Sequence, residues 1–311
     1  MMYFRDFIEQ PDQLKSYEEL LTKLSKFVMK CSQLLLDAFY VAEANALKEP
    51  CNSHATTLML TRHIIETVDG VSVLVKNGCA QNCSPLLRSA FEGQLGLLYI
   101  LESDSKNRAL AYQVAHAHRK INMYRKYDPN DSLGKQFRAE LRDQSESLVF
   151  STVPGNLQEI IAGLEQMLKT PEYQSIETEW QLGVKKKKSP EWFSLFGGPR
   201  DVRSLSFHLQ LGTMYESLYR MWSNVIHAGS GFSHVGTSEQ REGTSIRPFR
   251  HPDGIETACS IAAQICLSSS RSLVNKYDAT QAERFTKTYE TNIRSEYLQM
   301  SHEKLINAPW R

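Results

Sequence analysis

Neither sign of charge dominates this chain. Its 311 residues carry 36 lysines and arginines against 35 aspartates and glutamates, so the formal net charge is +1 with neutral histidines. A protein so close to neutrality has no global attraction to nucleic acid or anionic membranes, and any such binding must come from a local patch. Hydrophobic residues make up 41% and charged residues 23%, which is ordinary for a globular protein with a substantial core.

Long apolar runs and closely spaced cysteines are also missing. No stretch approaches the roughly 18 uninterrupted apolar residues of a membrane span. The opening MMYFRDFIEQ has no basic region followed by an apolar run, so we expect no signal peptide. The six cysteines lack the density of a disulfide scaffold, and Cys79 and Cys83 have no second pair at zinc spacing. We therefore expect a cytoplasmic protein with reduced thiols and no membrane association.

Motifs for phosphate-cradling loops and metal centres are absent from the sequence as well. Neither Gly-x-x-x-x-Gly-Lys-Ser/Thr nor Gly-x-Gly-x-x-Gly occurs. The paired Glu-x-x-His motifs of di-iron bundles are not found either. We accordingly predict no cofactor and no metal, and we disfavour a metal enzyme of the helical-bundle type.

Apolar periodicity indicates an all-α, multi-helix bundle. A helix over 16–48 is expected to start at a capping box formed by Ser16 and Glu19. The next two helices, about 55–77 and after Ser84-Pro85, repeat apolar residues at every third or fourth place: Ile64, Val68, Val71 and Val75, then Leu87, Phe91, Leu95 and Leu98. No Asn-Gly or Asp-Gly hairpin between alternating apolar runs points to strands.

The rest of the chain divides into further helices and a loop-rich stretch. The polar region 104–150 is broken by Asp128-Pro129-Asn130-Asp131, a helix over 156–169 follows, and residues 184–204 are the most loop-like. Helices are then expected at 205–227, 254–276 and 279–300. We predict one all-α domain over 1–311, with a core bundle at about 16–102 and 205–300 and a helical excursion at about 104–204.

The helix over 205–227 ends in a group of polar side chains that could bind a ligand or catalyse a reaction. In YRMWSNVIHAG, Arg220, Ser223, Asn224 and His227 share one helical face, while Met221 and Trp222 fall on the apolar arc. His227 can take or give a proton near neutral pH, and Arg220 can hold a phosphate. Such a set suffices for metal-independent RNA cleavage, because RNA supplies its own 2′-hydroxyl nucleophile. The alternative is that these residues form the ordinary solvent-exposed face of an amphipathic helix.

Other polar residues are candidates for supporting roles. Arg62 with Glu66, and Arg88 with Glu92, stand four residues apart on helices that are otherwise apolar. Each pair is either a surface salt bridge or part of a buried polar network that orients Arg220 or His227. The run Lys185, Lys186, Lys187 and Lys188, in a loop beside Trp192 and Phe193, is a candidate contact for an RNA backbone or a solvated linker.

Two stretches carry a resemblance to a known superfamily. Residues 61–100 contain Arg-x-x-x-Glu and Arg-Ser-x-x-Glu, and residues 215–229 contain Tyr-x-x-x-Tyr-Arg-x-x-Ser-x-x-x-His. Over about 55–275 the chain resembles a group of bacterial all-α domains of unknown function. That group is similar to the HEPN (higher eukaryote and prokaryote nucleotide-binding) superfamily of helical bundles.

The resemblance implies a function and a set of partners. Many HEPN proteins dimerise and cleave RNA without metal through Arg-x(4–6)-His, often as toxins or anti-phage effectors. Arg220 and His227 match that motif at its longest spacing, although Met221 stands where the superfamily usually has a polar residue. A homodimer would join two such sites, with RNA as substrate and an antitoxin or defence protein as partner. The alternative is a non-catalytic HEPN-like module that binds a protein or a nucleotide.

Overall fold

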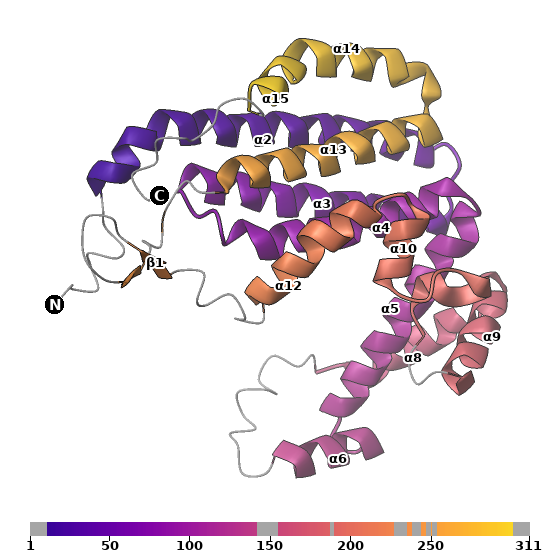
Figure 1. Cartoon of the computed structure of the whole chain (residues 1–311). Helices are drawn as coiled ribbons and strands as arrows, with labels where there is room; N and C mark the ends of the chain where they lie inside the picture. The colour runs from indigo at the N-terminus through magenta and orange to yellow at the C-terminus, as the bar shows by residue number, and fades with distance from the viewer. Residues whose placement is uncertain are drawn as a thin grey trace. The chain divides into compact units, whose positions relative to one another are not determined.

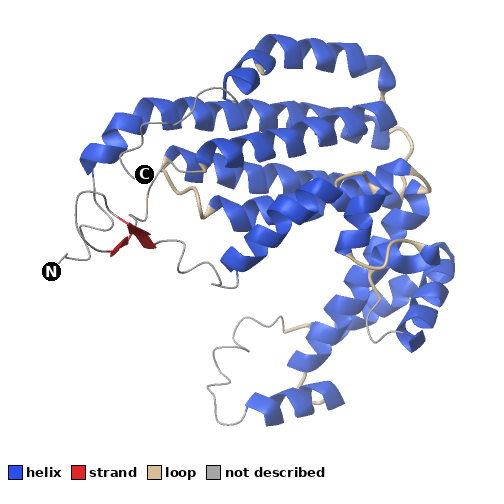
Figure 2. Ribbon diagram, viewed as in Figure 1, coloured by secondary structure: helices blue, strands red, loops and turns tan. Residues whose placement is uncertain are grey.

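The protein is helical almost throughout the part that its structure describes. The computed structural model describes residues 11–141, 155–186, 190–226, 235–237, 244–246, 250 and 254–300 (Figures 1 and 2). The only strands in these ranges are β1 (Val235–Thr237) and β2 (Thr244–Ile246), a short antiparallel pair that the sequence does not predict. The expected all-α class is confirmed. The chain forms two compact units, one of residues 1–103 and 202–311 and the other of residues 104–201.

Four helices build the core of the first unit. They are α2 (Pro11–Ala46), α3 (Asn52–Lys76), α4 (Cys83–Glu102) and α13 (Ile255–Tyr277), which pack against one another as Figure 1 shows. The apolar faces predicted for α3 and α4 are buried as expected, except that Leu98 is half-buried. The expected start of the first helix is wrong, because α2 begins five residues before the Ser16 capping box. The α4 helix likewise begins at Cys83, ahead of Pro85, which is tolerated in a first turn.

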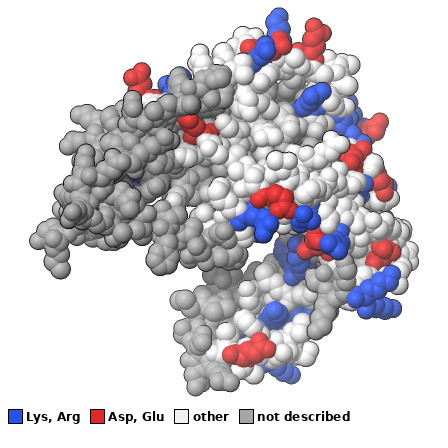
Figure 3. All heavy atoms as spheres, viewed as in Figure 1, with Lys and Arg blue, Asp and Glu red and all other residues white. Residues whose placement is uncertain are grey.

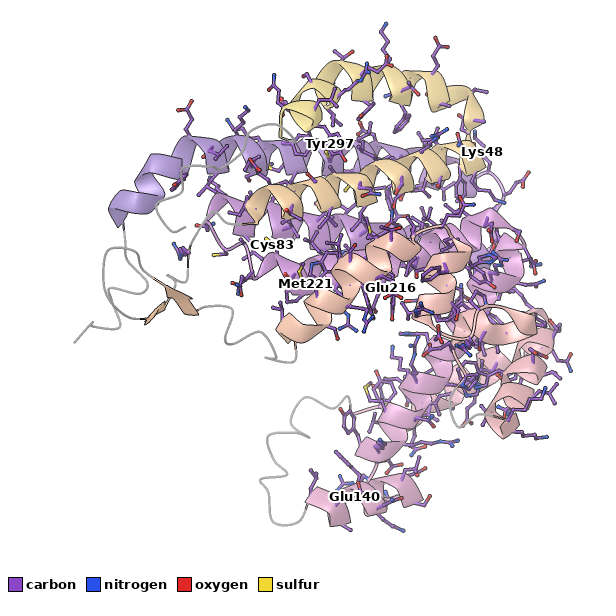
Figure 4. The ribbon with its side chains drawn as sticks, in the orientation of Figure 1. Lys48, Cys83, Glu140, Glu216, Met221 and Tyr297 are labelled. Carbon is purple, nitrogen blue, oxygen red and sulfur yellow. The ribbon has the colours of Figure 1, made fainter. Side chains whose placement is uncertain are left out.

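The C-terminal helices lie against this bundle. The expected single helix over 279–300 is divided into η4 (Ala279–Gln281), α14 (Ala282–Asn292) and α15 (Arg294–Met300). Between the last two, Ile293 is buried. Tyr297 stacks on Phe27 of α2 with ring centroids 6.3 Å apart, and Figure 4 labels Tyr297 beside that helix. An ion pair between Lys30 and Glu296 joins the same two helices.

The second unit is assembled around α5. It comprises α5 (Ser105–Tyr127), α6 (Ser132–Leu141), α8 (Leu157–Leu168), α9 (Pro171–Lys186) and the 3-10 segment η1 (Trp192–Gly197). The predicted break at Asp128-Pro129 is confirmed by the boundary between α5 and α6. On α5, His118 stacks on Trp180 of α9 with ring centroids 5.2 Å apart, and its Nε2 lies 2.7 Å from Oε2 of Glu177.

A close contact fixes α6 on the turn that follows α5. Gly134 of α6 is buried, and a Cβ atom there would lie 1.7 Å from the backbone oxygen of Asp128. The carboxyl oxygens of Asp128 in turn accept hydrogen bonds from the backbone N–H of Asn130 and from the side chain of Gln158. Only glycine fits where the two backbones approach so closely.

Residues 184–204, the stretch expected to be the most loop-like, contain more helix than their sequence suggested. Residues 184–186 are the last turn of α9, and η1 and the start of α10 (Val202–His208) occupy much of the remainder. Lys185 and Lys186 in the last turn of α9 interact favourably with the negative end of the helix dipole, which helps the helix extend through them. Residues 187–189 lie outside the described residues.

The expectation of one continuous helix over 205–227 is also wrong. After α10 the chain turns at Gln210, whose φ of 61° is left-handed, and the N–H of Leu211 donates to the carbonyl of Ser206. This is a Schellman stop, with glutamine where glycine is usual. The chain resumes as α11 (Gly212–Met214), the π-helical turn η2 (Tyr215–Tyr219) and α12 (Arg220–Ile226). His208 joins α10 to α4, with Nε2 2.8 Å from Oε2 of Glu102.

Candidate functional site

Helix α12 packs on α4. It carries the described part of the catalytic stripe, the name we give to the predicted site residues Arg220, Ser223, Asn224 and His227. Trp222 is 2% exposed and faces the bundle, whereas the Arg220 side chain is 71% exposed. Ser223, one turn after Arg220, is half-buried. The Asn224 backbone belongs to α12, but its side chain and all of His227 lie outside the described residues. Joint action of Arg220 and His227 therefore stays a prediction.

The assignment of Met221 to the apolar face is wrong, because its side chain is 50% exposed. The π turn before it explains the error. The N–H of Arg220 donates to the carbonyl of Tyr215, five residues back, so η2 holds more residues per turn than an α-helix. A wheel drawn at a constant 100° per residue is therefore out of register beyond Tyr219. Figure 4 labels Met221 and Glu216 on the segment that includes η2 and α12.

A carboxylate of η2 lies between two arginines. Oε1 of Glu216 accepts a 2.6 Å hydrogen bond from Nε of Arg203 on α10, and Oε2 accepts a 3.1 Å bond from Nη1 of Arg220. The bonds from Arg203 and then Arg220 lower the pKa of the Glu216 carboxyl. The Arg203 guanidinium also lies over the Phe207 ring, 4.8 Å from its centroid. We refer to Arg203, Glu216 and Arg220 as the arginine clamp.

A second polar group ties η2 to α4. Nη2 of Arg88 donates a 2.8 Å hydrogen bond to the Tyr219 hydroxyl, which donates a 2.8 Å bond to Oε1 of Glu92. Nε of Arg88 donates a 3.1 Å bond to the same Glu92 oxygen, and the Arg88 guanidinium lies 4.3 Å from the Tyr219 ring centroid. One of the two predicted Arg/Glu pairs is thus part of a network that holds the residue next to Arg220.

Burial and hydrogen bonding shift the pKa values of this network. Burial, together with the bond to Glu92, raises the pKa of Tyr219 to about 12. Burial opposes the charge of Arg88, but the hydrogen bond to Glu92 and the contact with Tyr219 raise its pKa overall. The network therefore holds a protonated phenol and a charged guanidinium throughout the physiological range.

The pair Arg62–Glu66 has a different setting. Nε of Arg62 lies 2.8 Å from Oε1 of Glu66, with the two side chains 63% and 60% exposed, so this is a surface salt bridge. The next residue, His63, instead links α3 to α4, because its Nε2 lies 2.9 Å from the Ser89 hydroxyl. Ser89 precedes Glu92 by about one turn of α4, so His63 adds an imidazole beside the α4 face that carries the tyrosine network.

The predicted RNA-contact lysines belong to the second unit. Lys185 and Lys186 are exposed at the end of α9, whereas Lys187 and Lys188 lie outside the described residues. Trp192 and Phe193 are buried, with ring centroids 5.5 Å apart, so neither presents a free face to a nucleobase. On the face drawn in Figure 3, described basic and acidic side chains are interspersed.

Three residues of these sites escaped prediction from the sequence. The Glu216–Arg220 pair was recognisable in principle, because its spacing of four residues matches that of the two predicted pairs. Nothing in the sequence links Arg203 to Glu216 across the Gln210 turn. Tyr219 belongs to the Tyr-x-x-x-Tyr-Arg motif, but the sequence does not reveal its partners, which lie more than 120 positions away.

Within the described ranges no helix is long and apolar enough to cross a membrane, and no three metal-ligating side chains come together. A model of a family of unknown function, DUF5677, matches residues 54–243, more than half of the chain. No curated protein matches the chain, and no solved structure does.

Proposed function

The chain belongs to the DUF5677 family, and we propose that it is a HEPN-like, metal-independent endoribonuclease that acts as a toxin-type effector in bacterial anti-phage defence. The observation that carries the proposal is the exposure of Arg220. Tyr219 and Trp222 anchor the segment on α4, while 71% of the Arg220 side chain is open to a ligand. A fixed helix that presents an arginine suits recognition of an RNA phosphate.

The proposed reaction uses the RNA's own nucleophile. The 2′-hydroxyl oxygen attacks the adjacent phosphorus while the bond from phosphorus to the 5′-oxygen breaks. This leaves a 2′,3′-cyclic phosphate and a free 5′-hydroxyl. His227 of one protomer takes the 2′-hydroxyl proton, and His227 of the other protonates the leaving oxygen. Arg220 offsets the charge that builds on the phosphoryl oxygens, and Ser223 and Asn224 orient these groups.

The nuclease proposal implies a second protomer, an RNA substrate, an inhibitory protein and a cytoplasmic location. A homodimer brings two copies of the stripe together, which a single stripe with one histidine requires. RNA is the substrate, and Lys185–Lys188 add backbone contacts. An antitoxin or another defence protein keeps the nuclease inactive in the cytoplasm, and no metal or cofactor takes part.

A second candidate function rests on Met221. Its side chain is 50% exposed on α12, where it could contribute to a larger apolar contact with another protein. In this alternative the protein is a non-catalytic HEPN-like module that binds a partner protein or a nucleotide. The polar stripe of α12 is then a dimer seam or an interfacial hydrogen-bond network.

Incubation of the purified protein with total cellular RNA in EDTA tests the nuclease proposal. The wild type is expected to cleave, and both His227→Ala and Arg220→Ala are expected to abolish cleavage. Arg62→Ala is the matched control, because it removes an arginine of similar exposure from an exposed Glu pair in the same unit. It should cleave like the wild type.

Two outcomes favour the binding module. Absence of cleavage by the wild type, both alone and after separation from any co-purifying protein, argues against the nuclease. Equal cleavage by all four proteins shows that Arg220 and His227 are not its source. In either case a Met221→Ser variant that loses self-association, measured by analytical ultracentrifugation, would assign α12 to an interface.

A further inference from the structure

The arginine clamp holds an anion in the manner of a phosphate site. Each oxygen of the Glu216 carboxylate is bound by a different guanidinium, one from α10 and one from α12. Two non-bridging oxygens on one phosphorus present the same pair of acceptors, and guanidinium groups bind carboxylate and phosphate through the same donors. The carboxylate thus stands where a phosphoryl group would be bound.

We propose that Arg203 and Arg220 bind a phosphodiester of single-stranded RNA, and that Glu216 is the internal anion which occupies this site until RNA displaces it. The inference rests on the proposed function for its ligand, and it adds Arg203 as a binding residue and Glu216 as a regulator of access. Two arginines and one glutamate leave the clamp with an excess positive charge. When Glu216 swings away, both cations become available to the phosphodiester.

Exposure makes the exchange feasible. The side chains of Arg203 and Arg220 are 59% and 71% exposed, so a ligand reaches both guanidinium groups without opening the bundle. Ion pairs in such positions are weak, because water and salt screen them. The Arg203 guanidinium is nevertheless positioned over the Phe207 ring, and the backbone of Arg220 follows the anchored Tyr219.

An exposed aromatic favours RNA over an acidic protein segment. The Phe207 side chain beneath Arg203 is 50% exposed, although Gly212 packs so closely that a Cβ there would lie 2.8 Å from the ring. The Arg203 guanidinium lies over this ring and is itself 59% exposed, and unpaired RNA bases stack on guanidinium planes as well as on aromatic rings. An acidic peptide has no base that would stack at this position.

Binding of a fluorescent, single-stranded 2′-O-methyl RNA to the full-length protein tests the clamp. This probe lacks the nucleophilic 2′-hydroxyl, so the measurement does not depend on cleavage. In fluorescence anisotropy Glu216→Gln should tighten binding about two- to five-fold, the range that loss of an exposed ion pair allows. Arg203→Gln and Arg220→Gln should each weaken binding and reduce the salt slope by about one.

The chain provides a matched control in Arg62 and Glu66. Glu66→Gln and Arg62→Gln change the net charge as the clamp variants do, and they break an equally exposed pair in the same unit. These variants should bind RNA like the wild type. If Glu66→Gln tightens binding as much as Glu216→Gln, or if Arg203→Gln binds like the wild type, the clamp proposal is overturned.

Further arms separate the ligand and the underlying function. Inorganic phosphate that displaces the RNA at concentrations too low to change the ionic strength would overturn the assignment to RNA. If the variants change RNA binding as expected but the protein does not cleave total RNA, the clamp proposal stands and the nuclease proposal is rejected. Cleavage that depends on Arg220 and His227 but is indifferent to Arg203 and Glu216 would do the reverse.

Discussion

Arg88 contacts Tyr219 in two ways at once. Its Nη2 donates a 2.8 Å hydrogen bond to the phenol oxygen, and its guanidinium carbon lies 4.3 Å from the ring centroid. The two residues belong to segments 131 positions apart, and the Glu92 carboxylate bonds to both. This triangle fixes the π turn on α4 and thereby sets where α12 begins.

Removing the Tyr219 hydroxyl should weaken the fold measurably. Tyr219→Phe keeps the ring but deletes two hydrogen bonds to charged groups, at an expected cost of about 1–3 kcal/mol in the free energy of unfolding. Urea denaturation measures the difference. Tyr215→Phe is the control, since Tyr215 also stacks on Tyr219 but its hydroxyl makes no hydrogen bond within the described residues. Equal losses in the two variants would contradict a special role for the triangle.

The raised pKa of Tyr219 predicts a loss of stability in alkali. Between the unfolded value near 10 and the folded value of about 12, the unfolded chain binds fewer protons than the native protein. The free energy of unfolding therefore falls as the pH rises through this window, and below pH 10 the contribution is constant. Tyr219→Phe should show a shallower fall. Its tyrosinate absorbance should also lack one group that titrates near pH 12, and an unchanged titration curve would refute the assignment.

Thiol reactivity should divide the six cysteines into two classes. Cys31, Cys83, Cys259 and Cys266 are buried, and burial raises the pKa of Cys31 and Cys83 to about 12 and also holds the pKa values of Cys259 and Cys266 well above the usual thiol range. Because the thiolate is the reactive form, iodoacetamide at pH 8 should label only Cys51 and Cys79 in the native protein. Peptide mass spectrometry reads the sites. Urea should expose the remaining four, and native labelling of any of them would indicate an open core.

Gly134 and Gly163 should respond to alanine in opposite directions. At Gly134 a Cβ would meet the Asp128 backbone, so Gly134→Ala should cost about 1–3 kcal/mol and free α6 from its turn. At Gly163 of α8 the space is open, and Gly163→Ala should add about 0.5–1 kcal/mol of stability. Hydrogen exchange of α6 and α8 amides separates the two effects. Unchanged protection of α6 in Gly134→Ala would contradict the close approach.

Local periodicity made the bundle helices predictable, whereas the site depended on features without a local signal. The faces of α3 and α4 followed from apolar residues repeated every three or four places, because burial against neighbours imposes that spacing. The stop after α10 escaped because glutamine, not glycine, takes the left-handed position at Gln210. The exposure of Met221 escaped because a π turn leaves no mark in composition or periodicity.

The described half of the catalytic stripe shows the same division. The positions of Arg220 and Ser223 on one face of α12 agree with their spacing, since both lie beyond the π turn in regular α-helix. The other contacts of this segment are made by residues far away in the sequence. Arg88 and Arg203 reach this segment only through tertiary contacts, and helical spacing within a single segment cannot reveal them.

The π turn over Tyr215–Tyr219 accommodates an extra residue without changing where the later side chains point. Its wide turn holds one residue more than an α-helical turn, so deleting one of its five residues would restore ordinary helix and leave α12 in its present orientation. The same deletion within α12, where there is no wide turn to relax, would rotate every later side chain by about 100°. Loss of Met221, for example, would turn the buried Trp222 away from its place in the bundle.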